Sequence, residues 1–382
     1  MFIRQLLASF TTIFLSSVLS GVCRSAVAET YCPAVSSNSP TLSTDRRQNK
    51  TSLRIVQYNT EWLFLDYYAS SDCPGQGCSW HNQSAATTHM EYVGRIVQEL
   101  NPDIINICEV EGCDELNALI NAMVPNAMEP NVVEPNVVEP SSTTTSAYRS
   151  YMVQGKDTST GQNVGMLTKI DPLVNLYRTE ERVAYPVPGS KCASTSSSAV
   201  TSTDTTTGVS KHYITEFMFG DLHVAMIGVH LLAFPTDPTR CQEREAQAQV
   251  IQNVIAKYAS LDYEIIVLGD FNDFDAEVLD SNKNQPTSLV LDIFKGLAGN
   301  MAGTYELTNV AEDIVQEDRF SDWWDQNDNC VSGPNEFSMI DHILVSKSIQ
   351  EYVSAVFIYH GYSEFCDTYN SDHYPVVLDL SM

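Results

Sequence analysis

The feature that most constrains the fold is a set of short, almost uninterrupted apolar runs. This pattern is typical of strands buried on both faces, and it occurs at residues 53–58, 103–110, 223–230 and 264–269. Apolar residues at helical spacing predict helices at 89–100 and 243–258, each between two of these strands. Two strand–helix–strand units predict an α/β fold in which two sheets stack on each other with helices outside.

The N-terminus has the pattern of a secretory signal peptide. A short basic segment and an apolar stretch lead to Ala26-Val27-Ala28, so we expect cleavage after residue 28 and a secreted protein. An uncleaved membrane anchor is the alternative. The rest of the chain has no second apolar run long enough to span a bilayer.

Composition divides the remaining chain into one large domain and several polar segments. Residues 29–52 are expected to be a polar linker, and the domain is expected to cover 53–382. The repeated EPNVV motif within 124–146 has a proline every five residues, which excludes both helix and central strand. That segment and the Ser/Thr-rich segment 193–210 are predicted to be surface insertions.

The cysteines give a further expectation about the compartment. Removal of the signal peptide would leave nine of the ten cysteines, enough for four disulfides and one free thiol. Cys108 lies within an expected buried strand and is the first candidate for the free thiol. Cys73 and Cys78 are plausible partners in a turn-rich segment.

Charge limits how the protein could bind a polyanion. The chain has 48 acidic and 21 basic residues, a net charge of −27 that becomes −29 without Arg4 and Arg24. A broad basic nucleic-acid face is therefore excluded. Local phosphate contacts remain possible, and their candidates are Lys156, Lys169, Arg182, Arg240 and Arg244.

Most of the expected strands end in a polar residue that a core would not favour. The residues concerned are Asn59, Glu109, His230, Asp270, Asn272, Asp341, Asp372 and His373. Strand ends are where catalytic groups gather in α/β folds, and buried carboxylates are costly unless they are paired or bind a metal. Together these residues predict a site for a hard cation with acid–base groups beside it.

Each of these residues taken alone also has a structural explanation. Asn59 could form a turn, Glu109 could cap the helix that begins near residue 114, and His230 could be a core histidine. Asp270 and Asn272 could form Asx turns. The order and spacing of the whole set favour a common site over these separate explanations.

The motifs that contain these residues resemble the endonuclease/exonuclease/phosphatase superfamily, whose members include the DNase I-like metal-dependent phosphoesterases. The matching segments are QYNTEWLF (57–64), DIINICEVEG (103–112), IGVHLLAF (227–234), VLGDFNDF (267–274), MIDHILVS (339–346) and SDHYPVV (371–377). The resemblance implies a four-layer α/β/β/α sandwich of two stacked mixed sheets.

The resemblance also implies a role for each matching residue. Glu109 would be the principal ligand of Mg²⁺, or of Mn²⁺ or Ca²⁺, with Asn59 and Asp372 shaping the metal site. Asp270 and Asn272 would orient the attacking water, and His373, held by Asp341, would contact the phosphate or act as a base. A cationic His230 would protonate the leaving group. His342 is expected to be structural, because it points away from Asp341.

Three functions compete on this basis. The leading hypothesis is a secreted, divalent-metal-dependent nuclease that hydrolyses phosphodiester bonds of extracellular DNA or RNA, monomeric and without stable membrane association. The second is a secreted phospholipid phosphodiesterase of the sphingomyelinase type, for which Trp323-Trp324 is the only indication of a lipid-contacting loop. The third is a non-catalytic binding protein, which the complete set of polar residues disfavours.

Overall fold

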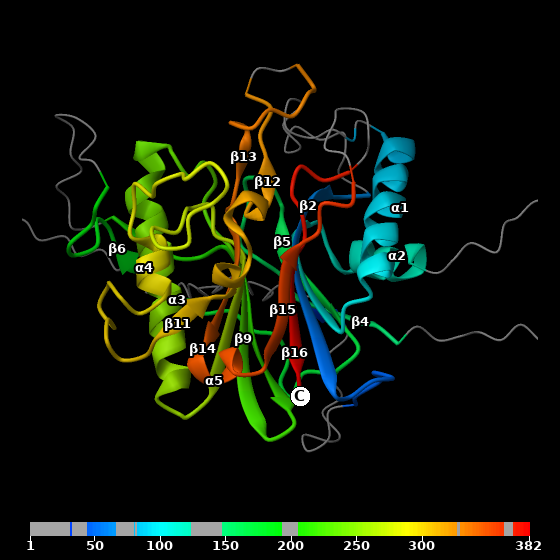
Figure 1. Ribbon diagram of the computed structural model, residues 1–382, viewed down its shortest axis with the longest axis horizontal. Helices are drawn as coiled ribbons and strands as arrows, with labels where there is room; N and C mark the ends of the chain where they lie inside the picture. The colour runs from blue at the N-terminus through cyan, green and yellow to red at the C-terminus, as the bar shows by residue number, and fades with distance from the viewer. Residues whose placement is uncertain are drawn as a thin grey trace, which may run out of the picture.

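Two sheets stacked face to face form the centre of the protein in the computed structural model (Figure 1). The structure describes residues 31–32, 44–65, 80, 82–123, 147–192, 205–326, 329–362 and 370–382. The first sheet has the order β1-β4-β5-β3-β2-β16-β15 and the second β11-β14-β10-β9-β8. Helices α1 and α2 cover the outer face of the first sheet, and α3 and α4 cover that of the second. The predicted four-layer α/β/β/α sandwich is confirmed.

The strands of the two large sheets mix parallel and antiparallel pairs. The first sheet contains β1 (Tyr31–Cys32), β2 (Ser52–Leu63), β3 (Ile104–Val110), β4 (Arg149–Val153), β5 (Asn163–Thr168), β15 (Val353–Ile358) and β16 (Val376–Ser381). The second contains β8 (Lys211–Phe219), β9 (Leu222–His230), β10 (Glu264–Asp270), β11 (Leu307–Asn309) and β14 (Asp341–Ser346). The two parallel pairs, β2 with β3 and β9 with β10, are the predicted strand–helix–strand units.

Helices and two short hairpins complete the described elements. The helices are α1 (Gln83–Leu100), α2 (Cys113–Ala122), α3 (Pro238–Ala259), α4 (Val290–Phe294), α5 (Lys347–Gln350) and the 3₁₀ turns η1 (Val310–Asp313) and η2 (Gln316–Asp318). The hairpins pair β6 (Val183–Ala184) with β7 (Thr206–Thr207) and β12 (Asp322–Trp323) with β13 (Phe337–Ser338). Among the described residues, no helix is long and apolar enough to cross a membrane.

Three apolar layers hold the sandwich together. One lies between the sheets and includes Ile55, Met226 and Leu268; the other two lie between each sheet and its helices. Helix α3 begins at Pro238, five residues earlier than predicted, because the Asp237 side chain caps its N-terminus by accepting from the Thr239 amide.

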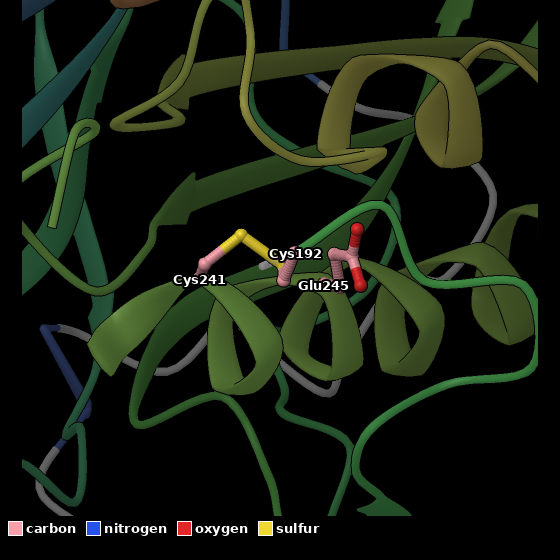
Figure 2. Close-up of side chains that lie close together, drawn as sticks. All are labelled: Cys192, Cys241 and Glu245. Atoms are coloured by element: carbon pink, nitrogen blue, oxygen red, sulfur yellow. A yellow bond between two sulfur atoms is a disulfide. The ribbon is translucent and has the colours of Figure 1, made fainter. Parts of the chain in front are cut away.

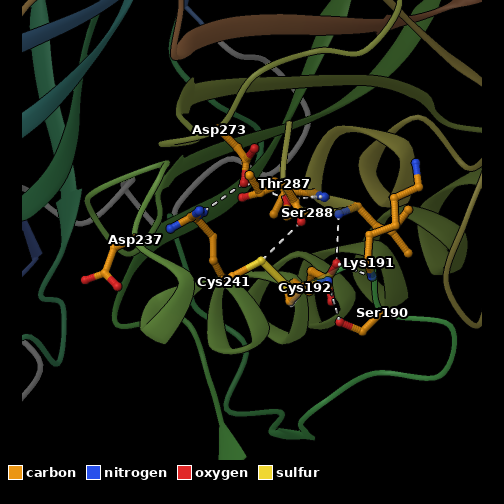
Figure 3. Close-up of a disulfide and its surroundings, with 12 residues drawn as sticks. Ser190, Lys191, Cys192, Asp237, Cys241, Asp273, Thr287 and Ser288 are labelled. Atoms are coloured by element: carbon orange, nitrogen blue, oxygen red, sulfur yellow. Dashed lines mark hydrogen bonds and ion pairs between the residues drawn. A yellow bond between two sulfur atoms is a disulfide. The ribbon is translucent and has the colours of Figure 1, made fainter. Parts of the chain in front are cut away.

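Two disulfides connect described parts of the chain. Cys32 bonds to Cys113, and Cys192 bonds to Cys241 at the start of α3 (Figure 3). Cys108 is buried and is the free cysteine among the described residues, as predicted. The segments 1–28, 124–146 and 193–204 and the pair Cys73 and Cys78 lie outside the described residues. The domain boundary at residue 53 remains a prediction, although Cys32 before it is bonded to the domain.

Candidate active site

The predicted site residues come together where the central strands of both sheets end. In the second sheet, Asp270 is paired with His230 on one side and with Asp341 on the other. This register depends on a glycine before Asp270, because a Cβ at position 269 would lie only 1.9 Å from the Val229 carbonyl oxygen. Three polar side chains therefore lie in one row across β9, β10 and β14.

Asn59 connects this row to the first sheet. It lies in β2 and is 1% exposed. Its side-chain Nδ2 is 3.1 Å from Asp270 Oδ2, 3.3 Å from Glu109 Oε1 and 3.3 Å from His373 Nε2. Asn59 is thus the meeting point of the site rather than a turn residue. The strand continues beyond it to Leu63 through a register shift, so β2 is longer than predicted.

Glu109 lies at an irregularity near the end of β3. It has a positive φ of 65°, and the pairing of β3 with β5 shifts at this position. The Trp62 amide donates to its Oε2 at 3.1 Å. Burial, followed by the charge of Asp372, raises the pKa of Glu109 against the opposing effect of Lys211. Glu109 does not cap α2, whose cap residue is Gly112 without a side-chain bond.

Asp341 and His373 form a buried pair between the sheets. His373 Nδ1 is 2.7 Å from Asp341 Oδ2, and Asp341 also accepts from Gln57 Nε2 at 2.9 Å and Ser321 Oγ at 3.0 Å. Burial alone would lower the pKa of His373, but Asp341 and Asp372 outweigh it and raise the pKa well above its usual value. The charges of Asp341 and Asp372 thus favour the protonated form of His373.

His230 has a different electrostatic environment. Its Nε2 lies 3.6 Å from Asp270 Oδ2 and 3.9 Å from Glu109 Oε1. Burial, and then the nearby charges of Lys211 and His373, hold its pKa well below the usual value. Lys211 thus disfavours the cationic form of His230 that the sequence led us to expect, and the role of His230 as an acid stays a prediction.

Asp270 is the last residue of β10, and Asn272 lies in the tight turn that follows. The Asn272 amide donates to Asp270 Oδ1 at 2.9 Å, and its side-chain Nδ2 donates to the Leu231 carbonyl at 3.3 Å. These contacts link the loops that follow β9 and β10. Burial and then the charge of Asp341 raise the pKa of Asp270 to about 8.

Two carboxylates of the site, Asp322 and Glu61, were not predicted from the sequence. Asp322 begins the β12–β13 hairpin, and its Oδ1 is 3.7 Å from His373 Nε2. Burial raises the pKa of Asp322 to about 7. Glu61 Oε2 accepts from the Asp372 amide at 3.2 Å. Neither residue ends an expected strand, so the pattern that identified the others gave no signal for them.

Two of the basic residues expected to contact phosphate instead form ion pairs outside the site. The Lys169 ammonium bonds Asn101 and Asp103 before the start of β3, at the opposite end of that strand from Glu109. Arg244 is fully buried and pairs with Asp273 at 2.9 Å. Helical spacing could not show that Arg244 faces inward. His342 bonds Asn309 and the Asp273 carbonyl, in agreement with its predicted structural role.

The carboxylates of the site suit a hard divalent cation. The pKa values of Glu61, Glu109, Asp270, Asp322 and Asp372 are all raised, first by burial, with repulsion from neighbouring carboxylates adding to it. Ligand atoms of Asp322, Asp372 and His373 all lie within 4.8 Å of one another. Oxygen donors of this kind bind Mg²⁺, Mn²⁺ or Ca²⁺, and such a cation would relieve the repulsion.

A second cluster of potential ligands does not form a metal site. Cys192, Cys241 and Glu245 lie close together at the start of α3 (Figure 2). Both sulfur atoms are joined in a disulfide, so neither is a thiolate that could bind a metal. Glu245 Oε1 instead accepts from the Leu289 amide at 2.8 Å.

The family follows from a comparison of the sequence with family models. The model described as the Endonuclease/Exonuclease/phosphatase family matches residues 56–373. The chain belongs to this family. The match covers every predicted site residue, and it makes the protein a phosphoesterase of a family whose members generally use divalent metals. A comparison with curated protein sequences found no match.

Solved structures of similar shape have low sequence identity to the chain. Truncated TDP2 from Caenorhabditis elegans is 14% identical, with a TM-score of 0.46 over 87% of this chain and 98% of that one. TDP2 from D. rerio, complexed with a single-stranded DNA product, is 16% identical, with a TM-score of 0.48 over 87% and 100%. A variant of the 3' phosphatase NExo from Neisseria, bound to a product DNA hairpin, is 13% identical, with a TM-score of 0.48 over 86% and 100%.

Proposed function

We propose that this protein is a secreted, divalent-metal-dependent phosphodiesterase that hydrolyses nucleic acid. The observation that carries the proposal is a continuous row of side chains across both sheets, from His373 through Asn59 and Asp270 to His230, with neighbouring distances of 3.3, 3.1 and 3.6 Å. One histidine, held by Asp341, and the other, beside Lys211, thus lie on opposite sides of the Asn59–Asp270 contact. That asymmetry suits a reaction with distinct attacking and leaving sides.

Glu109 and Asp372 would hold the metal, with Asn59 fixing Glu109 through its amide. A bound divalent cation polarises a non-bridging phosphate oxygen and neutralises charge that develops on it. The protein's own residues would provide the proton transfer and the contacts to the phosphate.

These residues divide into an attacking side and a binding side. Asp270, when ionised, would take a proton from the attacking water, and Asn272 would keep Asp270 oriented through the 2.9 Å amide bond. His373, charged and fixed by Asp341, would donate from Nε2 to a phosphate oxygen. General base help of this kind is typically worth about 10²–10⁴ in rate.

Nucleic acid is favoured as substrate by the pair His230 and His373 and by the export that the N-terminal segment of the sequence predicts. Two disulfides in the described residues are compatible with an oxidising compartment. The net charge of −27 means that binding should be weak and sensitive to salt, because few cations are available to replace counterions.

A phospholipid substrate is the second candidate. The observation that favours it is the β12–β13 hairpin, where Trp324 is 59% and Val331 58% exposed. The hairpin also carries Asp322, which faces His373. Trp323 does not contribute, since it is buried and its indole donates to Glu336. Exposed apolar residues beside a phosphoesterase site could contact lipid.

One experiment distinguishes these substrates. Purified protein is incubated with plasmid DNA, RNA or sphingomyelin vesicles, in Mg²⁺ and in EDTA. We expect cleavage of nucleic acid that requires Mg²⁺ and is lost in His373→Ala. His223→Ala is the matched control, because His223 is exposed at the opposite end of β9 from His230.

Each other outcome would support a different function. Release of lipid headgroup without cleavage of nucleic acid would establish the phospholipid function. No metal-dependent hydrolysis of any substrate by folded wild-type protein would favour the non-catalytic scaffold.

A further inference from the structure

Lys211 is a nearly buried cation beside His230. It is the first residue of β8, and the antiparallel pairing of β8 with β9 places it directly opposite His230. Its Nζ lies 3.4 Å from His230 Nε2. Lys211 is 9% exposed, so its charge is held within the site rather than in solvent.

The contacts of Lys211 compensate this charge only partly. Its ammonium bonds the neutral Gln162 Oε1 at 3.1 Å, and the nearest carboxylate oxygen, on Asp157, lies 3.8 Å away. A buried ammonium normally needs a close anionic partner, because desolvation costs several kcal/mol per ion. The charge of Glu109 also acts on Lys211, but among the described residues no carboxylate oxygen lies within hydrogen-bond distance of its Nζ. Lys211 therefore has capacity for an anion at the His230 side of the site.

The contact with Lys211 also indicates which nitrogen of the His230 ring accepts. An ammonium carries only donors, so it can approach Nε2 at 3.4 Å favourably when that nitrogen accepts. The other ring nitrogen, Nδ1, is buried and has no hydrogen-bond partner among the described residues. Native proteins rarely leave such an atom unsatisfied.

We propose that Lys211 binds the phosphodiester of the substrate on the leaving-group side, donating to a phosphate oxygen next to His230. The proposal rests on the phosphodiesterase function proposed above and adds the residue that supplies local positive charge. Lys211 would thereby act as a local phosphate contact of the kind predicted from the sequence, whose five candidates included Lys169 and Arg244; these two form contacts elsewhere in the protein.

The test measures how binding depends on salt. A labelled single-stranded oligonucleotide is titrated in Mg²⁺ at several NaCl concentrations, with His373→Ala as the background to prevent cleavage. Each phosphate contact contributes about 0.7 to the slope of log affinity against log salt for single strands. We expect Lys211→Met to lower this slope by about that amount, and Lys211→Arg to retain it.

Kinetics with a small chromogenic diester, bis(4-nitrophenyl) phosphate, complement the binding test. Loss of a charge-assisted hydrogen bond to the phosphate should raise KM about 10- to 100-fold in Lys211→Met. Lys257→Met is the matched control, because it removes the same charge from an exposed position near the end of α3. Thermal unfolding of each variant confirms that it is folded.

The outcomes are distinguishable. If folded Lys211→Met has the same salt slope and the same KM as Lys257→Met, Lys211 does not contact the phosphate and the proposal is wrong. If the wild-type protein cleaves neither nucleic acid nor the diester, the proposed function itself fails. If it cleaves the diester but not nucleic acid, KM alone decides the role of Lys211.

Discussion

The buried ion pair between Arg244 and Asp273 makes the sharpest stability prediction. Arg244 Nε donates to Asp273 Oδ2 at 2.9 Å, and both side chains are 0% exposed. The rest of the guanidinium donates to three backbone carbonyls of the loop after β9, at 2.8 to 3.3 Å. This one side chain therefore joins the loop that follows His230 to the turn that carries Asp270 and Asn272.

Arg244→Met should be strongly destabilising. Removing one partner of a buried ion pair costs about 3–5 kcal/mol, because the other charge stays buried without compensation. Loss of the bonds to three carbonyls adds to this cost. Asp273 keeps its bonds from Ser288 and from the Phe274 amide, which limits the total, so we expect at least about 4 kcal/mol.

The assay is urea unfolding followed by circular dichroism, in EDTA so that metal binding does not contribute. The double variant Arg244→Met/Asp273→Asn should recover at least about 2 kcal/mol, because it removes the uncompensated charge. Lys156→Met is the control: its partner Glu180 is equally exposed, at 61%, and such surface pairs contribute about 1 kcal/mol or less. A loss below about 1 kcal/mol in Arg244→Met would refute this account of the pair.

Three further predictions concern pH, the disulfides and the free thiol. Folding raises the pKa of Asp322 to about 7 and of Asp270 to about 8, so the folded protein binds these protons more tightly than the unfolded chain and is more stable at low pH. Calorimetry in EDTA should therefore show a free energy of unfolding that falls between pH 4 and 8, by up to about 1.4 kcal/mol per pH unit for each carboxyl. A constant free energy of unfolding over this range would contradict the prediction. Cys192→Ala/Cys241→Ala opens a loop of 49 residues and should cost about 2–4 kcal/mol in urea unfolding; no change would show that the bond does not restrain the unfolded chain. Cys108 is buried and should react with iodoacetamide only after unfolding; labelling of the native protein would show that this strand opens.

The sequence was sufficient to predict the site residues at strand ends, but not those that reach the site from other elements. Asn59, Glu109 and Asp270 could be found because each follows an apolar run directly. Asp322 could not, since it lies in a two-residue strand without an apolar pattern, and it reaches the site through a bridge to His373. Contacts of that kind depend on long-range packing, which local periodicity does not contain.

Lys211 is a different case, because the sequence does contain its signal. Gly220 and Asp221 form a two-residue hairpin loop between β8 and β9, with Phe219 opposite Leu222. Such a loop fixes the register of both strands. Counting eight residues back from Phe219 and eight forward from Leu222 pairs Lys211 with His230. Gly220, which has a φ of 59°, marks the position of this turn in the sequence. The register counted from the turn would therefore have placed Lys211 beside His230.

The most direct test of the central claim is the metal dependence of phosphodiester hydrolysis by wild-type protein and Glu109→Gln. Glu109 is bonded by Asn59 and Trp62 at the centre of the carboxylate cluster, and the amide nearly preserves its shape while removing the charge. We predict that the wild type hydrolyses bis(4-nitrophenyl) phosphate in Mg²⁺ and not in EDTA, and that Glu109→Gln loses at least about 10³-fold in rate at the same Mg²⁺ concentration. Hydrolysis that persists in EDTA, or that survives in Glu109→Gln, would contradict a metal-dependent centre at these strand ends.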